Sequence, residues 1–320
     1  MKSKPALLAL VPCLCSIAAP ALACDLCGVY NAPLAHGVID QGFHLAIAEQ
    51  FTHYGTLQFE SHEVPNDADQ FLNGSVSQVV LGYHFTDRVG MQFNLPIIYR
   101  SFRRAEGGEV EEDTESGLGD MSLSANYVLV RREKENWSVA WSLLAGVKFP
   151  TGDSERLKEE LEEEAPVPGE VEGAVHGHDL ALGSGSYDGI VGTELYLRWR
   201  RAFFTAETQY AIRSEGDFDY HYANDLTWSG GPGYYLVFAE DLTIALQANV
   251  SGESKGRDEF QGEKAEDTGL TIVFLGPRLS VSWKGRLSAE INGALPVDIQ
   301  NSALQAVPDW RLQAGLVWRF

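Results

Sequence analysis

The chain has 320 residues, of which 44% are hydrophobic, and it carries a formal net charge of -21. This acidic balance argues against a nucleic-acid partner, because phosphate groups would be repelled. After the first segment, the sequence contains no apolar run long enough for a membrane helix, so a membrane would have to be crossed by strands that pair with one another.

The first segment predicts export. A stretch with lysines at its start and an apolar run from Ala6 to Ala19 precedes Ala21-Leu22-Ala23, a small-x-small cleavage site. We expect residues 1–23 to be a signal peptide that is removed from the mature protein. Lipidation of Cys24 is the alternative, although Leu22 stands one position too close to the cysteine for the usual lipoprotein pattern.

Cys24 and Cys27 form a C-x-x-C pair within residues 24–41, a segment without a strand pattern. A disulfide loop or tether suits an oxidising compartment, and half of a metal site, with His36 as the nearest further ligand, is the alternative. A c-type haem site is disfavoured because Gly28 stands where a histidine is required. We hypothesise that this periplasmic segment folds back to plug or constrict a barrel formed by residues 42–320.

From residue 42 onward, strand-like runs alternate with turn residues. In each run apolar side chains occupy every second position, which places them on one face of a strand. The run from Trp137 to Phe149 and the final run to Phe320 show this most clearly. Trp310 and Trp318 in the final run would lie about 20 Å apart, close to the height of the apolar band of a membrane barrel. About twelve such strands are expected, an even number, as in single-chain bacterial barrels.

The connections between these runs alternate between short and long, and both ends of the barrel chain fall on the short side. Short periplasmic turns and long extracellular loops are typical of outer-membrane barrels, and a soluble sandwich has no reason for this alternation. The sequence therefore predicts an all-β fold, a transmembrane antiparallel β-barrel in the cell outer membrane. The predicted short turns are 86–88, 131–136, 200–201, 239–241 and 284–286, and the predicted long loops are 55–74, 102–117, 150–186, 214–224, 252–267 and 298–306.

The polar face of the strands is predicted to line the lumen. Acidic and basic side chains on this face are candidates for a selective constriction, and the alternative is that they only solvate and brace the interior. The candidate lumen-lining residues are His44, Glu194, Arg198, Glu207, Arg213, Arg278, Glu290 and Arg311.

The loop 150–186 is rich in glutamate and contains His176, His178 and Asp179. Ser154 is placed to cap a short helix through Leu157 and Leu161. Together, the carboxylates and imidazoles suggest a site for Zn²⁺, Cu²⁺ or Ca²⁺, with Cys24 and Cys27 as further metal candidates. The alternative is a solvated loop, or one that contacts lipopolysaccharide through divalent cations.

Enzyme motifs are sparse. Neither a G-x-S-x-G elbow nor a glycine-rich phosphate loop is present. His53 and His84 lie at strand ends, but neither belongs to a His-x-Ser arrangement with a nearby asparagine, so no enzyme activity is predicted.

Three glycine-containing motifs carry a family resemblance. G-L-G-D-M at 117–121, F-P-T-G-D at 149–153 and G-S-G-S-Y-D at 183–188 resemble those of the outer-membrane family named for the MetA pathway of phenol degradation, whose members are described as transporters. The resemblance spans roughly residues 75–320 and implies passage of small, aromatic or hydrophobic molecules. The C-x-x-C pair and the Glu/His loop are not part of that pattern.

Two functions therefore remain open. The first is a passive channel for small solutes, without a cofactor. The second is a scaffold that binds metal or a periplasmic or surface partner through Cys24, Cys27 and the acidic loop. In either case the expected partners are outer-membrane lipid, lipopolysaccharide and the barrel-assembly machinery, the last through the strand that ends at Phe320.

Overall fold

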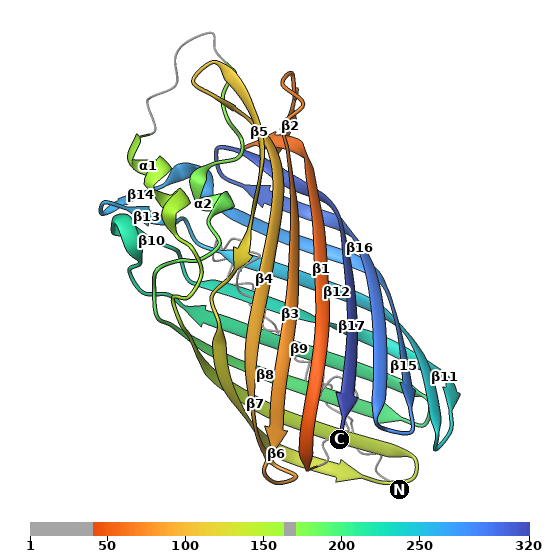
Figure 1. Cartoon of the computed structure of the whole chain (residues 1–320). Coiled ribbons are helices and arrows are strands. Elements are labelled where there is room, and N and C mark those ends of the chain that lie inside the picture. Colours follow the sequence, from red (N-terminus) through yellow and green to blue (C-terminus); the bar gives the residue numbers. More distant parts are fainter. Residues whose placement is uncertain (1–40, 163–170) are drawn as a thin grey trace, which may run out of the picture.

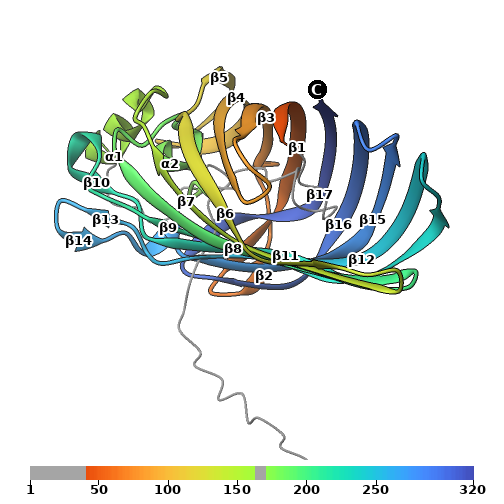
Figure 2. The same cartoon turned by 90° about the horizontal axis from the view of Figure 1, so that it is seen from below.

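The computed structural model describes residues 41–162 and 171–320. Within these residues, fourteen strands form one antiparallel sheet, and β17 pairs with β1 so that the sheet closes into a barrel (Figures 1 and 2). Two of the fourteen, β2 and β5, are additions at one end, which leaves twelve strands in the wall. The predicted fold class is confirmed. The predicted signal peptide and residues 24–40 lie outside the described residues.

The wall strands are long, and each is joined to its neighbour in chain order. They are β1 (Gly42–Phe59), β3 (Phe71–His84), β4 (Val89–Glu106), β6 (Ser122–Glu133), β7 (Trp137–Lys148), β8 (Asp188–Trp199), β9 (Ala202–Ile212), β11 (Asp225–Phe238), β12 (Leu242–Lys255), β15 (Leu270–Trp283), β16 (Leu287–Asn301) and β17 (Leu304–Arg319).

The two faces of the wall differ as the alternation predicts. Large apolar side chains on the outer surface are open to the surroundings; Ile47, Leu81 and Trp318 are each more than half exposed, at 52%, 56% and 53%. Polar side chains such as Asn94 and Ser124 point inward and are buried. This arrangement is the reverse of a soluble protein, and it is the one that a barrel in the outer membrane requires.

One outward-facing carboxylate interrupts the apolar surface. Glu49 of β1 accepts a hydrogen bond of 2.5 Å from the Ser75 hydroxyl and a second from the Ser77 hydroxyl, both on β3. Its two oxygens are therefore satisfied within the wall, which lowers the cost of placing a carboxylate on an apolar surface.

The five predicted short turns join wall strands at the end that also carries the C-terminus, and most of the predicted long loops lie at the other end (Figure 1). The long loop predicted at 298–306 is wrong, because β16 and β17 continue to a turn at Ser302 and Ala303. Ala303 adopts a positive φ of 50°, and the Asn301 side chain donates to its carbonyl oxygen at 3.0 Å, which closes the hairpin.

The remaining elements gather at the outer end. β5 (Glu109–Leu118) extends β4, β2 (His62–Val64) pairs with β1, and β10 (Tyr220–His221), β13 (Glu259–Phe260) and β14 (Glu263–Lys264) form a small sheet. The helices are short: η1 (Glu155–Lys158), α1 (Glu159–Glu162), α2 (Gly177–Leu180), η2 (Asp217–Asp219) and η3 (Glu266–Thr268). No helix among the described residues is long and apolar enough to cross a membrane.

Apolar side chains also pack inside the barrel, in its outer half. Phe102, Leu72, Val175 and Leu180 form one buried cluster, in which wall strands meet the β7–β8 connection. A second cluster joins β15, β16 and β17 through Leu270, Ile272, Phe274, Ala294 and Val307. The outer half of the interior is thus more apolar than the polar faces of the strands predict.

Candidate functional site

The candidate site is the interior of the barrel, and the eight predicted lumen residues occupy different levels of it. His44, Arg198, Arg213 and Arg311 are buried, whereas Glu194, Glu207, Arg278 and Glu290 are partly buried. The structure does not bring all eight together, so each group is described at its own level.

At the middle level, the structure brings three of the predicted residues together. Glu194 of β8 lies directly opposite Glu207 of β9, and Arg278 of β15 lines the same pocket. Ser229 donates a 2.5 Å hydrogen bond to Glu207, but neither carboxylate oxygen of Glu194 has a hydrogen-bond partner among the described residues. Two facing carboxylates repel each other, so this level favours a nearby cation such as Arg278.

Arg198 and Glu290 lie apart from this group. The guanidinium of Arg198 donates to the Ser138 hydroxyl at 3.1 Å and to the carbonyl oxygens of Arg200 and Lys134 at 3.1 and 3.3 Å, so it braces two periplasmic turns. Glu290 lies on β16, opposite Ser280 of β15 and Gly315 of β17.

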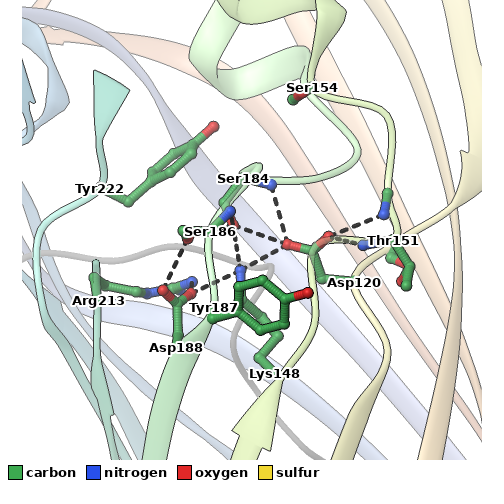
Figure 3. Close-up of polar contacts among 12 residues, drawn as sticks. Asp120, Lys148, Thr151, Ser154, Ser184, Ser186, Tyr187, Asp188, Arg213 and Tyr222 are labelled. Atoms are coloured by element: carbon green, nitrogen blue, oxygen red, sulfur yellow. Dashed lines mark hydrogen bonds and ion pairs between the residues drawn. The ribbon is translucent and has the colours of Figure 1, made fainter. Parts of the chain in front are cut away.

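At the outer rim, the three motifs that carried the family resemblance meet in space (Figure 3). One oxygen of Asp120 accepts the backbone N–H groups of Thr151 and Gly152 at 3.1 and 2.9 Å. The other accepts the backbone N–H of Ser184 at 3.0 Å and the ammonium of Lys148 at 2.6 Å. A carboxylate from the first motif thus fixes the backbone of the other two.

The same network continues along the wall. Lys148 also contacts Asp188 at 2.7 Å, and Arg213 bridges Asp188 and Asp225 at 2.7 and 2.8 Å. Every one of these side chains is buried, so each charge depends on its partner for stability. Arg311, by comparison, contacts Glu253 and donates to the Thr52 hydroxyl at 3.0 Å. Arg213 is therefore held in ion pairs at the rim, and Arg311 is held in an ion pair midway along β17.

Two glycines allow the motifs to approach so closely. A Cβ atom on Gly152 would lie 2.5 Å from the carbonyl oxygen of Leu182, and one on Gly183 would lie 2.5 Å from the carbonyl carbon of Gly152. The backbone of Leu182 and Gly183 donates to the carbonyl oxygen of Asp153 at 2.9 and 2.8 Å. These contacts close the base of the β7–β8 connection.

That connection crosses the outer mouth. Around the wall, the strand order β7, β6, β4, β3, β1, β17 places β17 on the far side from β7. Nevertheless, Ala174 accepts a 3.0 Å hydrogen bond from the backbone N–H of Ala306 on β17. Its own N–H donates to Gln70 at 3.0 Å, next to β3. The connection, here called the outer cap (residues 153–162 and 171–187), therefore lies over the lumen.

The predicted helix in the outer cap is present as η1 and α1, with Leu157 fully buried and Leu161 exposed. Ser154 precedes η1 but its hydroxyl does not cap it; instead it donates to Asp217 at 2.6 Å. The capping hydrogen bond is replaced by a contact between two outer connections, which sequence spacing does not reveal.

His176 and His178 lie together in the cap, with ring centroids 5.6 Å apart. The ring nitrogens of His178 lie 3.0 Å from Glu160 and 3.5 Å from Asp179, and His176 lies 3.5 Å from Asp267. No group of three or more metal-ligand side chains occurs within residues 41–162 and 171–320. The metal site at His176 and His178 stays a prediction, and Cys24 and Cys27 lie outside the described residues.

The ion pair between His178 and Glu160 is strong. Burial opposes the charged form of His178, but Asp179 and Glu160 outweigh it and raise its pKa well above the ordinary value of 6.5. Burial likewise opposes ionisation of Glu160, yet the charge and hydrogen bonds of His178 lower its pKa to about 2. Both groups are therefore charged at neutral pH and hold the cap together.

The outward face holds a polar cluster that sequence inspection missed. His53 Nδ1 lies 2.7 Å from Asn73 Oδ1, and Asn73 donates to the Ser101 hydroxyl at 3.1 Å. The three residues come from β1, β3 and β4, so only strand register reveals their proximity. A nucleophilic serine needs a direct bond to its base. Asn73 stands between Ser101 and His53, and the described residues show no such bond.

Of the comparisons with known proteins, that with solved structures bears on the fold. No family model and no curated protein matches the chain. Among solved structures, the chain is similar to the COG4313 outer membrane channel from Pseudomonas putida F1, at 14% identity over 88% of this chain and 97% of that chain, with a TM-score of 0.57. The beta domain of the Bordetella autotransporter BrkA has 12% identity over 88% and 100% of the two chains, with a TM-score of 0.44. The first likeness shows an outer-membrane barrel fold, while membership of the MetA-pathway family stays a prediction.

Proposed function

We propose that this barrel is an outer-membrane channel for the passive passage of small solutes. The observation that carries the proposal is a set of buried, inward-facing polar atoms without a hydrogen-bond partner among the described residues. Each would cost about 1–3 kcal/mol in a dry interior, so the set favours a lumen that water enters. Its members include side-chain atoms of Asn94, Ser122, Ser124 and Asn249.

The size of the lumen limits what passes. Barrels of eight strands are filled by side chains and those of about sixteen hold an open channel, so twelve strands suit a narrow path. The interior cavity beneath the outer cap has a volume of about 60 Å³. We therefore infer small solutes rather than oligosaccharides or peptides.

The walls of that cavity support a solute with an apolar or aromatic body. Leu72, Val175, Leu270 and Ile272 line it together with Tyr54 and Tyr222, and Arg100, Lys255 and Glu253 supply charge. The lining is mixed, because His178, Asp179 and Asp267 also belong to it, and such a lining suits a small amphiphilic ligand with an apolar ring and a polar group. This agrees with the substrate class that the sequence resemblance implies.

The test is conductance in planar bilayers and solute influx into liposomes. Wild-type barrels should conduct weakly, and phenol should enter faster than a sugar of low mass. Gln70→Ala should raise conductance, because Gln70 accepts the N–H groups of Ala174 and Ala105 and donates to the carbonyl of Glu172, which ties the cap to the wall.

The matched control is Gln300→Ala, since the side chain of Gln300 is exposed and donates a 3.1 Å hydrogen bond to Asp298 on the same strand. It should conduct like the wild type. A barrel that remains sealed both as wild type and with Gln70→Ala would contradict a channel role.

A further inference from the structure

A second cavity lies at the periplasmic end of the barrel, with a volume of about 220 Å³. Three permanent cations line it, Lys284, Arg286 and Arg319, and so do the imidazoles of His44 and His84. Among the described residues that line it, none is an aspartate or a glutamate. The cavity is therefore electropositive, in contrast to the net charge of the chain.

His44 is the central side chain of this cavity. It is only 4% exposed, and neither of its ring nitrogens has a hydrogen-bond partner among the described residues. Its ring centroid lies 5.3 Å from that of His84. Buried polar groups are nearly always paired, so an imidazole left in this state inside a cavity points to a ligand that pairs with it.

Two glycines leave space for the imidazole rings of His44 and His84. In the strand register, His44 lies opposite Gly82, and His84 lies opposite Gly90. A Cβ atom on Gly82 would come within 2.0 Å of the His44 ring, and one on Gly90 within 2.5 Å of the His84 ring. The absence of side chains at these two positions leaves the space that the two rings occupy, so the site is built by the backbone as well as by charge.

We propose that this cavity binds the carboxylate of a small aromatic acid. Three fixed cations and two imidazoles suit an anion and oppose a divalent metal ion. The volume far exceeds the ~30 Å³ share of one water molecule, which leaves room for an arene beside the carboxylate. Only the role of the site as a station for a permeating solute rests on the proposed channel function; the binding itself does not.

The experiment is calorimetric titration of the refolded mature chain in detergent with benzoate. Benzoate should bind saturably, and benzyl alcohol, which lacks the charge, should not. Arg319→Gln and Lys284→Gln should each weaken benzoate binding by about tenfold or more, the usual effect of losing a charge-assisted hydrogen bond. Arg201→Gln, which removes an exposed cation from a different periplasmic turn, should leave the affinity unchanged.

A second variant tests the geometry without a change in charge. Gly82→Ala should displace the His44 ring and weaken benzoate binding in the same direction as His44→Ala. Gly293→Ala is its control, because a new Cβ there meets no atom within 4 Å. Circular dichroism of each variant checks its folding. If Gly82→Ala misfolds, Lys284→Gln still tests the site, because Lys284 lies in an exposed turn where a substitution should not disturb folding.

The outcomes separate the two proposals. Equal benzoate affinity in the wild type, Arg319→Gln and Lys284→Gln would overturn the site, and so would inorganic phosphate binding as tightly as benzoate. If benzoate binds as expected but the barrel does not conduct, the channel function fails and the site stands. If the barrel conducts but benzoate binding does not depend on these residues, the channel function stands and the proposed site fails.

Discussion

At the scale of single residues, the buried pair of His178 and Glu160 makes the outer cap sensitive to pH. The pKa of His178 is raised, so its contribution to stability is complete below about pH 6.5 and is lost as the pH rises through the raised value. The pKa of Glu160 is lowered to about 2, so its contribution is present above about pH 4.5 and is lost as the pH falls toward 2.

We therefore predict that the cap is held most firmly between about pH 4.5 and 6.5. Hydrogen exchange of the amides in residues 171–182 should be slowest in this window, after correction for the intrinsic rate. His178→Ala should remove the dependence at the alkaline side and speed exchange by about two to four orders of magnitude, because breaking a buried pair costs about 3–5 kcal/mol, at about 1.4 kcal/mol per factor of ten.

His62 supplies the control for that measurement. It is exposed, and its ring lies 2.8 Å from the carbonyl oxygen of Glu60, outside the cap, so His62→Ala should leave exchange in the cap unchanged. Exchange that is independent of pH in the wild type, beyond the intrinsic effect, would show that this ion pair does not hold the cap.

The sequence predicted which face of a strand a side chain occupies, but not which residue it contacts. Alternation along each strand placed His44, Glu194 and Arg311 on the polar face, and the structure buries their polar atoms in the interior. It did not identify partners, because Glu194 meets Glu207 only through strand register and Arg311 meets Glu253 from a strand far along the chain. Pairings of this kind depend on the closed barrel rather than on local spacing.

At the scale of elements, Asp120 connects three segments that are separate in the sequence. Its carboxylate accepts three backbone N–H groups and the Lys148 ammonium. Asp120→Asn should destabilise the refolded barrel by about 3 kcal/mol, because Lys148 would lose one of its two carboxylate partners and keep Asp188 and the Ser184 hydroxyl. Urea unfolding followed by tryptophan fluorescence measures the change.

Asp113→Asn is the comparison variant, because Asp113 is exposed and accepts a 2.7 Å hydrogen bond from the N–H of the next residue, Thr114. It should change stability by less than about 0.5 kcal/mol. Equal effects of the two substitutions would mean that the rim network adds nothing to the stability of the barrel.

Turn chemistry explains which connections were predictable. The five short turns follow from the spacing of the strand patterns, and the structure has all of them. The hairpin at Ser302 and Ala303 was missed because Pro296, Asp298 and Pro308 interrupt the apolar pattern on both of its strands. Proline and aspartate normally indicate a loop, but the strands here tolerate them near a bulge in the pairing.

At the scale of the whole molecule, the tryptophans report on the surroundings of the barrel. All seven lie on wall strands, and six of them are at least 40% exposed. In liposomes made with brominated lipid, most of the tryptophan fluorescence should therefore be quenched, while a water-soluble quencher should have little effect. A barrel whose fluorescence responds only to the soluble quencher would not be embedded in the bilayer as the fold requires.

The overall architecture was predictable because one physical requirement repeats in every strand. A wall between lipid and water needs apolar and polar side chains in strict alternation, and twelve weak signals add up to a strong one. The crossing of the outer mouth was not predictable, because its contacts, such as that between Ala174 and Ala306, join residues without any shared pattern.

The pairing of β1 with β17 has a consequence for biogenesis. β1 is synthesised first among the wall strands, yet one of its two edges is satisfied only when β17, the last of them, has been made. Until then the chain exposes an unpaired strand edge and apolar outer side chains, so the barrel cannot fold strand by strand during translation. The unfolded chain must therefore be kept from aggregating until the barrel can close. The slow step of assembly should be the pairing of β1 with β17, the two wall strands that are farthest apart in the sequence.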